Sequence, residues 1–173
     1  MPPRSRLRQG LRALLAFSRP VDRHLAAAFL SPDLLALFDR LQRSEQLHSL
    51  NVLRTVLAQG PTPPDLAAAA LLHDVGKSRC RLAIWQKTLA VLVRAFAPGR
   101  FRRWADCDPA RRWAQPFAVA VHHPAWGAEM LAAAGASETT VWLAAHHADD
   151  PARWAQHPNI YLLQRLQRAD DAN

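Results

Sequence analysis

The sequence predicts an all-α protein folded as a single compact bundle of about seven to eight helices. Proline and glycine divide the chain into pieces of helix length. No segment shows the sustained alternation of apolar and polar residues that marks a half-buried strand. With 173 residues, the chain has the length of one domain and can bury about two thirds of its unfolded surface. No second globular domain is needed.

The first two helices are predicted by the residues at their ends. Ser31 is a favourable N-cap and Pro32 a favourable first residue, so we expect a helix from there to about Leu41. A second helix is expected over residues 44–59, and Gly60 ends it. The apolar inner stripe of that second helix is expected to consist of Leu47, Leu50, Leu53 and Leu57.

The middle of the chain predicts two further helices and a basic connection. A third helix is expected over residues 64–74, with Gly76 placed to end it. A fourth is expected over residues 82–97, where the two basic side chains lie seven residues apart and share one face. The rest of this helix, including Trp85, is expected to pack in the core. Residues 98–112 are basic and irregular, which indicates a loop or a short helix.

The second half of the chain predicts four more helices, over residues 113–122, 125–134, 138–147 and 159–170. Gly135 is placed to end one of them, and Pro151 interrupts the chain after another. No internal repeat is present, so the helices are expected to form one bundle.

The first 20 residues, MPPRSRLRQGLRALLAFSRP, are arginine-rich and amphipathic. This pattern is typical of a surface helix, and also of a transit peptide or of a helix that docks on a membrane. We therefore assign residues 1–30 to a basic helical extension and residues 31–173 to the domain. No apolar run has the length of a membrane span, so only peripheral membrane contact through the N-terminal helix stays open.

The formal net charge of +8 could indicate an anionic partner. All basic residues except Lys77 and Lys87 are arginine, however, and together with the abundant alanine this indicates a compositional bias of the coding DNA. Nucleic acid is therefore not expected as a partner. The two cysteines, Cys80 and Cys107, are too few and too far apart for a disulfide scaffold or a zinc site. A reducing, cytoplasmic compartment is expected.

Chemistry is indicated by LLHDVGK at residues 71–77, where a histidine and an aspartate follow an apolar run. Burying an imidazole and a carboxylate costs free energy unless both find partners, and a metal ion is one partner that accepts both. His73 and Asp74 would point about 100° apart on a helix, so they can meet at one ion only near a helix end. Gly76 supplies such an end.

Further ligand candidates lie on other predicted helices. His48 lies at the edge of the buried face of the 44–59 helix. Asp170 continues the inward stripe of the last helix, whereas Asp171 falls on its polar face, so only Asp170 is placed to be a ligand. Four more histidines end two of the intervening helices: His122, His123, His146 and His147.

The string HDVGK at residues 73–77 resembles the signature of the HD-domain phosphohydrolase superfamily. The resemblance extends over residues 44–173 through His48, the stretch HPAWGAEML at 123–131, the doubled histidine at 146–147, and Asp170. It implies a helical bundle of the HD-domain type. The sequence is most similar to the HD-GYP/HDIG-type branch, whose members are binuclear or trinuclear metal phosphodiesterases acting on cyclic dinucleotides, but it lacks the GYP motif.

This resemblance implies a binuclear metal site. A first ion would be held by His48, His73, Asp74 and Asp170, and a second by His123 with one or both of His146 and His147. Asp74 would bridge the two ions and be catalytic, together with Lys77 as a cation that faces phosphate. A lysine that points into solvent is the alternative interpretation of Lys77. The implied ions are divalent transition metals, namely iron or manganese, with zinc, nickel or cobalt as alternatives.

The chain also departs from the branch. Residues 148–151 read ADDP where the branch continues towards GYP. Ser44 stands where a glutamate would support a third metal ion, and Glu45 is one position off, so a trinuclear site is not expected. The segment between Asp74 and His123 is longer than in the branch and carries basic residues and tryptophan.

The expected function is a metal-dependent phosphohydrolase or phosphodiesterase that activates water against a phosphoester. Its expected partner is a phosphorylated small molecule, a nucleotide or a cyclic dinucleotide. Two alternatives stay open. One is a non-catalytic regulatory module that senses a metal or a nucleotide, and the other is a di-iron oxygenase with the HD fold.

Overall fold

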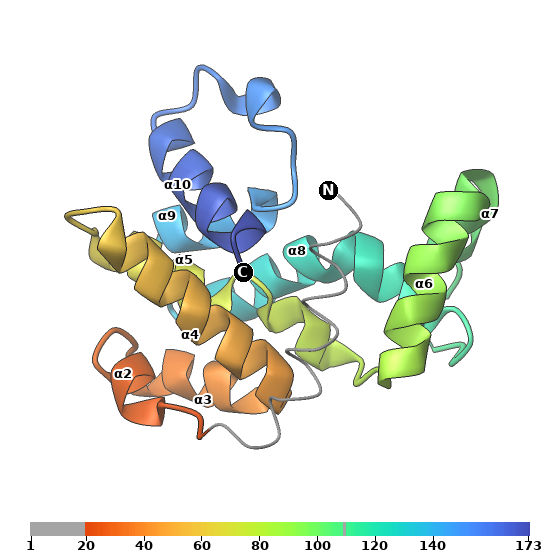
Figure 1. Cartoon of the computed structure of the whole chain (residues 1–173), viewed down its shortest axis with the longest axis horizontal. Coiled ribbons are helices and arrows are strands. Elements are labelled where there is room, and N and C mark those ends of the chain that lie inside the picture. The colour runs from red at the N-terminus through yellow and green to blue at the C-terminus, as the bar shows by residue number, and fades with distance from the viewer. Residues whose placement is uncertain (1–19, 109) are drawn as a thin grey trace.

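The computed structural model of the chain describes residues 20–108 and 110–173 (Figure 1). Every regular element in those two ranges is an α-helix or a 3-10 helix, and neither range contains a strand, which confirms the predicted fold class. In chain order, the elements are α2 (Arg23–Ala27), α3 (Pro32–Arg40), α4 (Arg43–Ala58), α5 (Pro64–Leu72), η2 (Val75–Arg79), α6 (Ile84–Phe96), α7 (Pro98–Ala105), α8 (Gln115–Ala133), α9 (Glu138–His146), η3 (Pro151–Trp154) and α10 (Ile160–Asp171). The amphipathic helix predicted at the N-terminus falls on residues 1–19 and lies outside the described residues.

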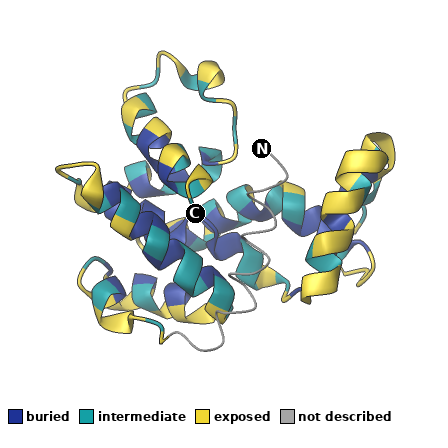
Figure 2. Ribbon diagram, in the orientation of Figure 1, coloured by how far each residue is buried: buried dark blue, intermediate teal, exposed yellow. Residues whose placement is uncertain are grey.

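The centre of the bundle is α5, in which every residue from Leu66 to Leu72 is buried (Figure 2). A helix that is apolar on all sides is stable only when other elements surround it. Here α4, α9 and α10 pack against it. The run of alanines at 67–70 lets these neighbours approach closely, and the histidine-aspartate pair that follows is carried into the interior.

The starts of α3 and α4 follow local chemistry. The hydroxyl of Ser31 accepts a hydrogen bond from the Leu34 amide, as its N-cap role predicts. Glu45 accepts a hydrogen bond from the Gln42 amide at 3.1 Å and so closes the first turn of α4. The inner stripe of α4 differs in part from the prediction, because Leu47 and Leu57 are half-buried. The buried residues of the helix are Glu45, Ser49, Leu50, Val52, Leu53 and Val56.

α10 is tied to the end of α4 by the buried side chain of Arg165. Its guanidinium donates to the carbonyl oxygen of Pro61 at 2.8 Å and to that of Val56 at 3.2 Å. Carbonyl groups at a helix end have no partner within their own helix, and Arg165 supplies one. This anchor fixes the helix that carries Asp170.

The prediction of two helices over residues 113–134 is wrong, because α8 continues through Pro124 as one helix. Proline inside a helix removes one hydrogen bond and costs roughly 3 kcal/mol. Packing on both sides of the proline offsets that cost. Phe117 and Leu131 are buried, and Gly127 lies against the backbone of Gly76 in η2.

α6 and α7 form a hairpin that projects from the bundle (Figure 1). Residues 98–105 are helical, so the first part of the basic connection predicted over residues 98–112 forms a short helix, and the described residues after it form turns. The hairpin packs on α8 through a small separate cluster of Ala90, Phe101, Ala105 and Phe117. The interpretation of Trp85 as a core residue is wrong, since 66% of it is exposed. α6 packs on the rest of the protein through the small residue Ala90, so its large apolar side chains stay exposed to solvent.

None of the helices in the described ranges combines the length and the apolar character that crossing a bilayer requires.

Candidate metal centre

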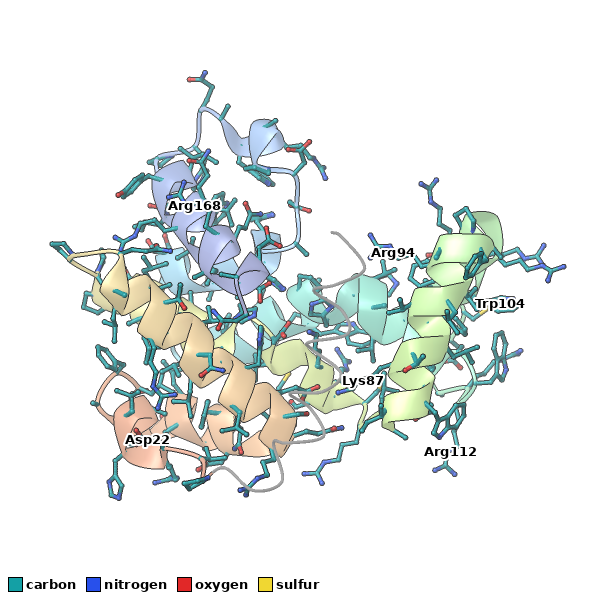
Figure 3. All side chains as sticks on the ribbon, viewed as in Figure 1. Asp22, Lys87, Arg94, Trp104, Arg112 and Arg168 are labelled. Atoms are coloured by element: carbon teal, nitrogen blue, oxygen red, sulfur yellow. The ribbon has the colours of Figure 1, made fainter. Side chains whose placement is uncertain are left out.

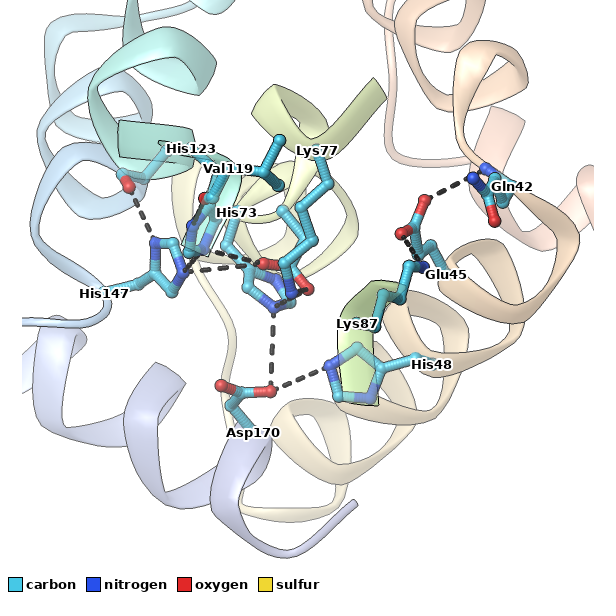
Figure 4. A network of polar contacts seen from close by, with 12 residues as sticks. Gln42, Glu45, His48, His73, Lys77, Lys87, Val119, His123, His147 and Asp170 are labelled. Carbon is cyan, nitrogen blue, oxygen red and sulfur yellow. Dashed lines mark hydrogen bonds and ion pairs between the residues drawn. The ribbon is translucent and has the colours of Figure 1, made fainter. Parts of the chain in front are cut away.

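Six side chains from segments far apart in the sequence meet beside the end of α5 (Figure 4). They are His48 from α4, His73 and Asp74 from the junction of α5 and η2, His123 from α8, His147 from the end of α9 and Asp170 from α10. α5 ends at Leu72, so His73 and Asp74 lie where the chain leaves the helix. Two adjacent side chains can therefore face one cluster.

One group of donor atoms surrounds one oxygen of Asp74. The Nε2 atom of His73 lies 3.6 Å from Asp74 Oδ2 and 3.6 Å from Asp170 Oδ1. The Nε2 atom of His48 lies 2.8 Å from the same Asp170 oxygen. Two helices, α4 and α10, and the end of α5 thus direct two imidazoles and two carboxylates at one point.

A second group surrounds the other oxygen of Asp74. The Nε2 atoms of His123 and His147 lie 3.3 and 3.6 Å from Asp74 Oδ1. These two nitrogen atoms lie 3.2 Å from each other. Asp74 therefore offers one oxygen to each group and is the only one of the six residues shared by both.

Backbone carbonyl groups orient three of the imidazoles. The Nδ1 atoms of His73, His123 and His147 lie 3.2, 2.9 and 2.8 Å from carbonyl oxygens of their own helical turns. A carbonyl oxygen only accepts, so each Nδ1 carries the proton and donates it. In the neutral ring this leaves a lone pair on Nε2, which is the arrangement of a metal-ligating histidine.

The residues present fit divalent metal ions. The Nε2 atom of His73 is buried and has no hydrogen-bond partner within the described residues. The lone pairs of His123 and His147 face each other at 3.2 Å, which is unfavourable unless a cation lies between them. Ligands held tetrahedrally at about 2.1 Å from an ion are about 3.4 Å apart. Most of the separations in both groups match that value.

The electrostatics keep the carboxylates ionised. Burial alone would raise the pKa of Asp74, but Lys77 and His73 outweigh it and hold that pKa well below its ordinary value. The pKa of Asp170 is lowered as well, against its burial, by the nearby imidazoles of His48 and His73. Burial lowers the pKa of His123, which favours its neutral form. Ionised carboxylates and neutral imidazoles are the forms that bind metals.

A model of the HD domain family matches residues 47–172, which is well over half of the chain. The chain belongs to the HD domain family. The matched range includes every residue of both donor groups, and HD domains are in general metal-dependent hydrolases that bind divalent metal ions. A search of curated proteins and a search of solved structures found no match.

The structure of this HD domain separates the two histidines at 146 and 147. His147 faces the second donor group, whereas His146 Nδ1 lies 2.8 Å from Asp149 Oδ2. The ring of His146 also lies against Trp142 and Trp154, with centroids 5.0 and 4.1 Å away. His146 was a candidate ligand by resemblance, and the structure does not bring it to the cluster.

We predict that His147→Ala lowers the metal content of the purified protein by about one ion per chain. The reason is that His147 supplies one of only three atoms in the second donor group. His146→Ala serves as the matched control and is expected to leave the metal content unchanged. Elemental analysis of both variants measures the difference, and equal losses would contradict the assignment.

A cavity of about 1340 Å³ opens beside the cluster, and two of the residues that line it, Lys87 and Arg168, are functional candidates that the sequence did not single out. Lys87 and Arg94 extend into it from α6, and Arg168 lines it from α10 (Figure 3). The ammonium group of Lys87 donates to one carboxylate oxygen of Glu45 at 2.8 Å, and the Gln42 amide donates to the other. Both oxygens of Glu45 therefore already have partners. The sequence feature that could have indicated this basic lining is the pair Lys87 and Arg94, which lie seven residues apart in the otherwise uncharged α6.

Proposed function

We propose that this HD domain hydrolyses a phosphoester of a nucleotide-like substrate, using two divalent transition metal ions of which iron and manganese are the first candidates. The observation that carries the proposal is the shared carboxylate of Asp74, whose two oxygens face two different sets of donor atoms. A carboxylate in this position suits a pair of ions better than a single ion. Catalysis by paired ions is a common route to phosphoester hydrolysis.

The chemistry that the metals supply, when bound, is a lowered pKa of a water molecule and neutralisation of charge on the phosphoryl oxygens. The protein's own contribution begins with Lys77. Its ammonium group donates to Asp74 Oδ2, and about a third of its side chain is exposed on the cavity side. Burial alone would lower the pKa of Lys77, but Asp74 outweighs it and raises that pKa. Lys77 is therefore a permanent cation that can donate to a phosphate oxygen.

The cavity supports an anionic substrate of nucleotide size. Ligand cavities commonly measure about 300–1,000 Å³, so a cavity of about 1340 Å³ has room for a whole nucleotide. Five cationic side chains line it: Arg54, Lys77, Lys87, Arg94 and Arg168. Arg54 and Lys87 already have acidic partners, which leaves Arg94 and Arg168 as the better candidates for a second phosphate group. A nucleotide or a cyclic dinucleotide fits these features.

The proposal is tested by elemental analysis combined with a panel of generic phosphodiesters, nucleoside phosphates and cyclic dinucleotides. Two transition metal ions per chain and hydrolysis of at least one class are expected. Stoichiometric metal without turnover would contradict the proposal and favour a regulatory sensor. Iron with consumption of oxygen and no hydrolysis would assign the site to oxygenase chemistry.

We predict that Lys77→Ala retains both metal ions but lowers kcat/KM for the hydrolysed substrate by about a hundredfold. A charge-assisted hydrogen bond to phosphate is lost, while all six donor residues remain. Lys77→Arg keeps the positive charge and is expected to recover part of the rate. Loss of metal from Lys77→Ala would show instead that this lysine maintains the cluster.

A further inference from the structure

The exposed side of α6 carries an unusual number of large apolar side chains. Six of the nine exposed large hydrophobic residues in the described ranges lie on this one helix. We call five of them the α6 face: Ile84, Trp85, Leu89, Leu92 and Phe96. Trp85 is 66% exposed and Phe96 is 84% exposed, so the ends of the face are open to solvent. Contiguous exposed apolar surface of this kind marks an interaction site.

The α6 face is broad and convex. At 100° per residue, the arc from Val91 through Ile84 to Leu89 spans about 160° and contains no charged side chain. The two cations of α6, Lys87 and Arg94, fall on the opposite side and line the cavity. A single partner helix covers a narrower stripe than this. The width of the face fits an extended surface better than a helix.

The face offers almost no hydrogen-bonding groups to a partner. Thr88 is the polar residue within the arc, and its hydroxyl already donates to the carbonyl oxygen of Ile84 at 3.0 Å. Specific protein interfaces usually carry about one hydrogen bond per 100–200 Å². The only free side-chain donor on the face is then the indole N–H of Trp85, and tryptophan is a residue that membrane interfaces accommodate, so the face is better suited to the apolar boundary of a lipid bilayer than to a protein.

The charge around the α6 face selects an anionic partner. Residues 81–105 contain six basic residues and no acidic residue. Lys87 and Arg94 lie on the cavity side of α6, which leaves Arg81 before the helix and Arg100, Arg102 and Arg103 on α7. A second copy of the hairpin would bring the same positive charge. Residues 1–19 would also bring positive charge, because they contain arginines and no acidic residue. Neither occupant is complementary in charge.

We propose that the α6–α7 hairpin docks on the surface of a bilayer that contains anionic lipid. Tryptophan and phenylalanine would enter the interfacial region, and the arginines of α7 would bind lipid phosphates. The hairpin projects from the bundle and is attached to it through the small cluster on α8 (Figures 1 and 2). It can therefore reach a membrane without disturbing the core.

The test is sedimentation of the full-length chain with vesicles of phosphatidylcholine, prepared with and without phosphatidylglycerol. Binding is expected to be at least tenfold stronger to the anionic vesicles and to weaken with added salt. The Trp85→Ser/Phe96→Ser double variant is expected to lower binding at least tenfold. Its matched control, Val121→Ser/Tyr161→Ser, removes exposed apolar side chains elsewhere and is expected to bind unchanged.

A second pair of variants tests the charge. Arg102→Glu on α7 is expected to weaken binding more than fivefold, whereas Arg40→Glu on α3 is not. Equal binding to both kinds of vesicle would overturn the proposal. Unchanged binding of the Trp85→Ser/Phe96→Ser variant would overturn it as well, because another part of the chain would then bind the lipid. A dimer that this variant converts to a monomer in light scattering would assign the α6 face to a second copy.

Discussion

An Asp74→Ala variant is expected to lose both metal ions and all measurable hydrolysis. Asp74 is the residue common to the two donor groups, and its oxygens lie 3.3 Å from His123 Nε2 and 3.6 Å from His73 Nε2. Loss of a residue that only hydrogen-bonds to a metal ligand commonly lowers metal affinity or activity by about 10- to 100-fold. In the proposed two-ion site, Asp74 would bind both ions, so its removal should cost considerably more.

Two companion variants separate ligation from general damage to the fold. Asp74→Asn keeps the size of the side chain but removes its charge, so it should also lose metal. Asp171→Ala removes the exposed acidic neighbour of Asp170 and should retain metal and activity. Circular dichroism checks the helix content of each variant. Full activity in a folded Asp74→Ala protein would refute the proposed chemistry.

A Gly76→Ala variant is expected to lower the free energy of unfolding by about 3 kcal/mol. An added Cβ would overlap the carbonyl oxygen of His123 and lie 2.7 Å from the Gly127 amide nitrogen. Both are backbone atoms of α8, so no side-chain rotation can relieve the clash. Overpacking typically costs about 1–3 kcal/mol, and a clash with backbone belongs at the upper end.

Gly99→Ala is the matched control for this substitution. A Cβ at Gly99 meets no atom within 4 Å, and alanine favours helix over glycine by about 1 kcal/mol. Its stability in urea unfolding should therefore stay the same or rise. Gly76→Ala should also lose the metal ion of the second donor group, since α8 carries His123. An unchanged unfolding midpoint for Gly76→Ala would mean that α8 and η2 are not packed this closely.

Helix ends with their own chemical signals could be predicted from the sequence. Ser31 and Pro32 mark the start of α3 without reference to any distant residue. The apolar run before His73 indicates a buried helix, and α5 is buried on all sides. Asp170 could be chosen over Asp171 because helical periodicity alone assigns them to different faces.

Features that depend on neighbouring helices could not be predicted in this way. Pro124 is a local signal for a helix break, but the close packing of Gly127 on η2 keeps α8 continuous. The apolar composition of α6 predicts burial, yet its large side chains stay exposed because the hairpin projects from the bundle. Periodicity states which residues share a face, but not whether a neighbour covers that face.

The sequence by itself determined the all-helical class, the family and the residue types of the cluster, because these depend on local propensity and on an ordered set of motifs. The tertiary structure decided that His147 and not His146 joins the cluster, and that one Asp74 carboxylate faces two donor groups. Adjacent residues at a helix end point in directions about 100° apart. Periodicity does not say which of the two directions faces the cluster. That depends on where α8 and α10 place the other ligands.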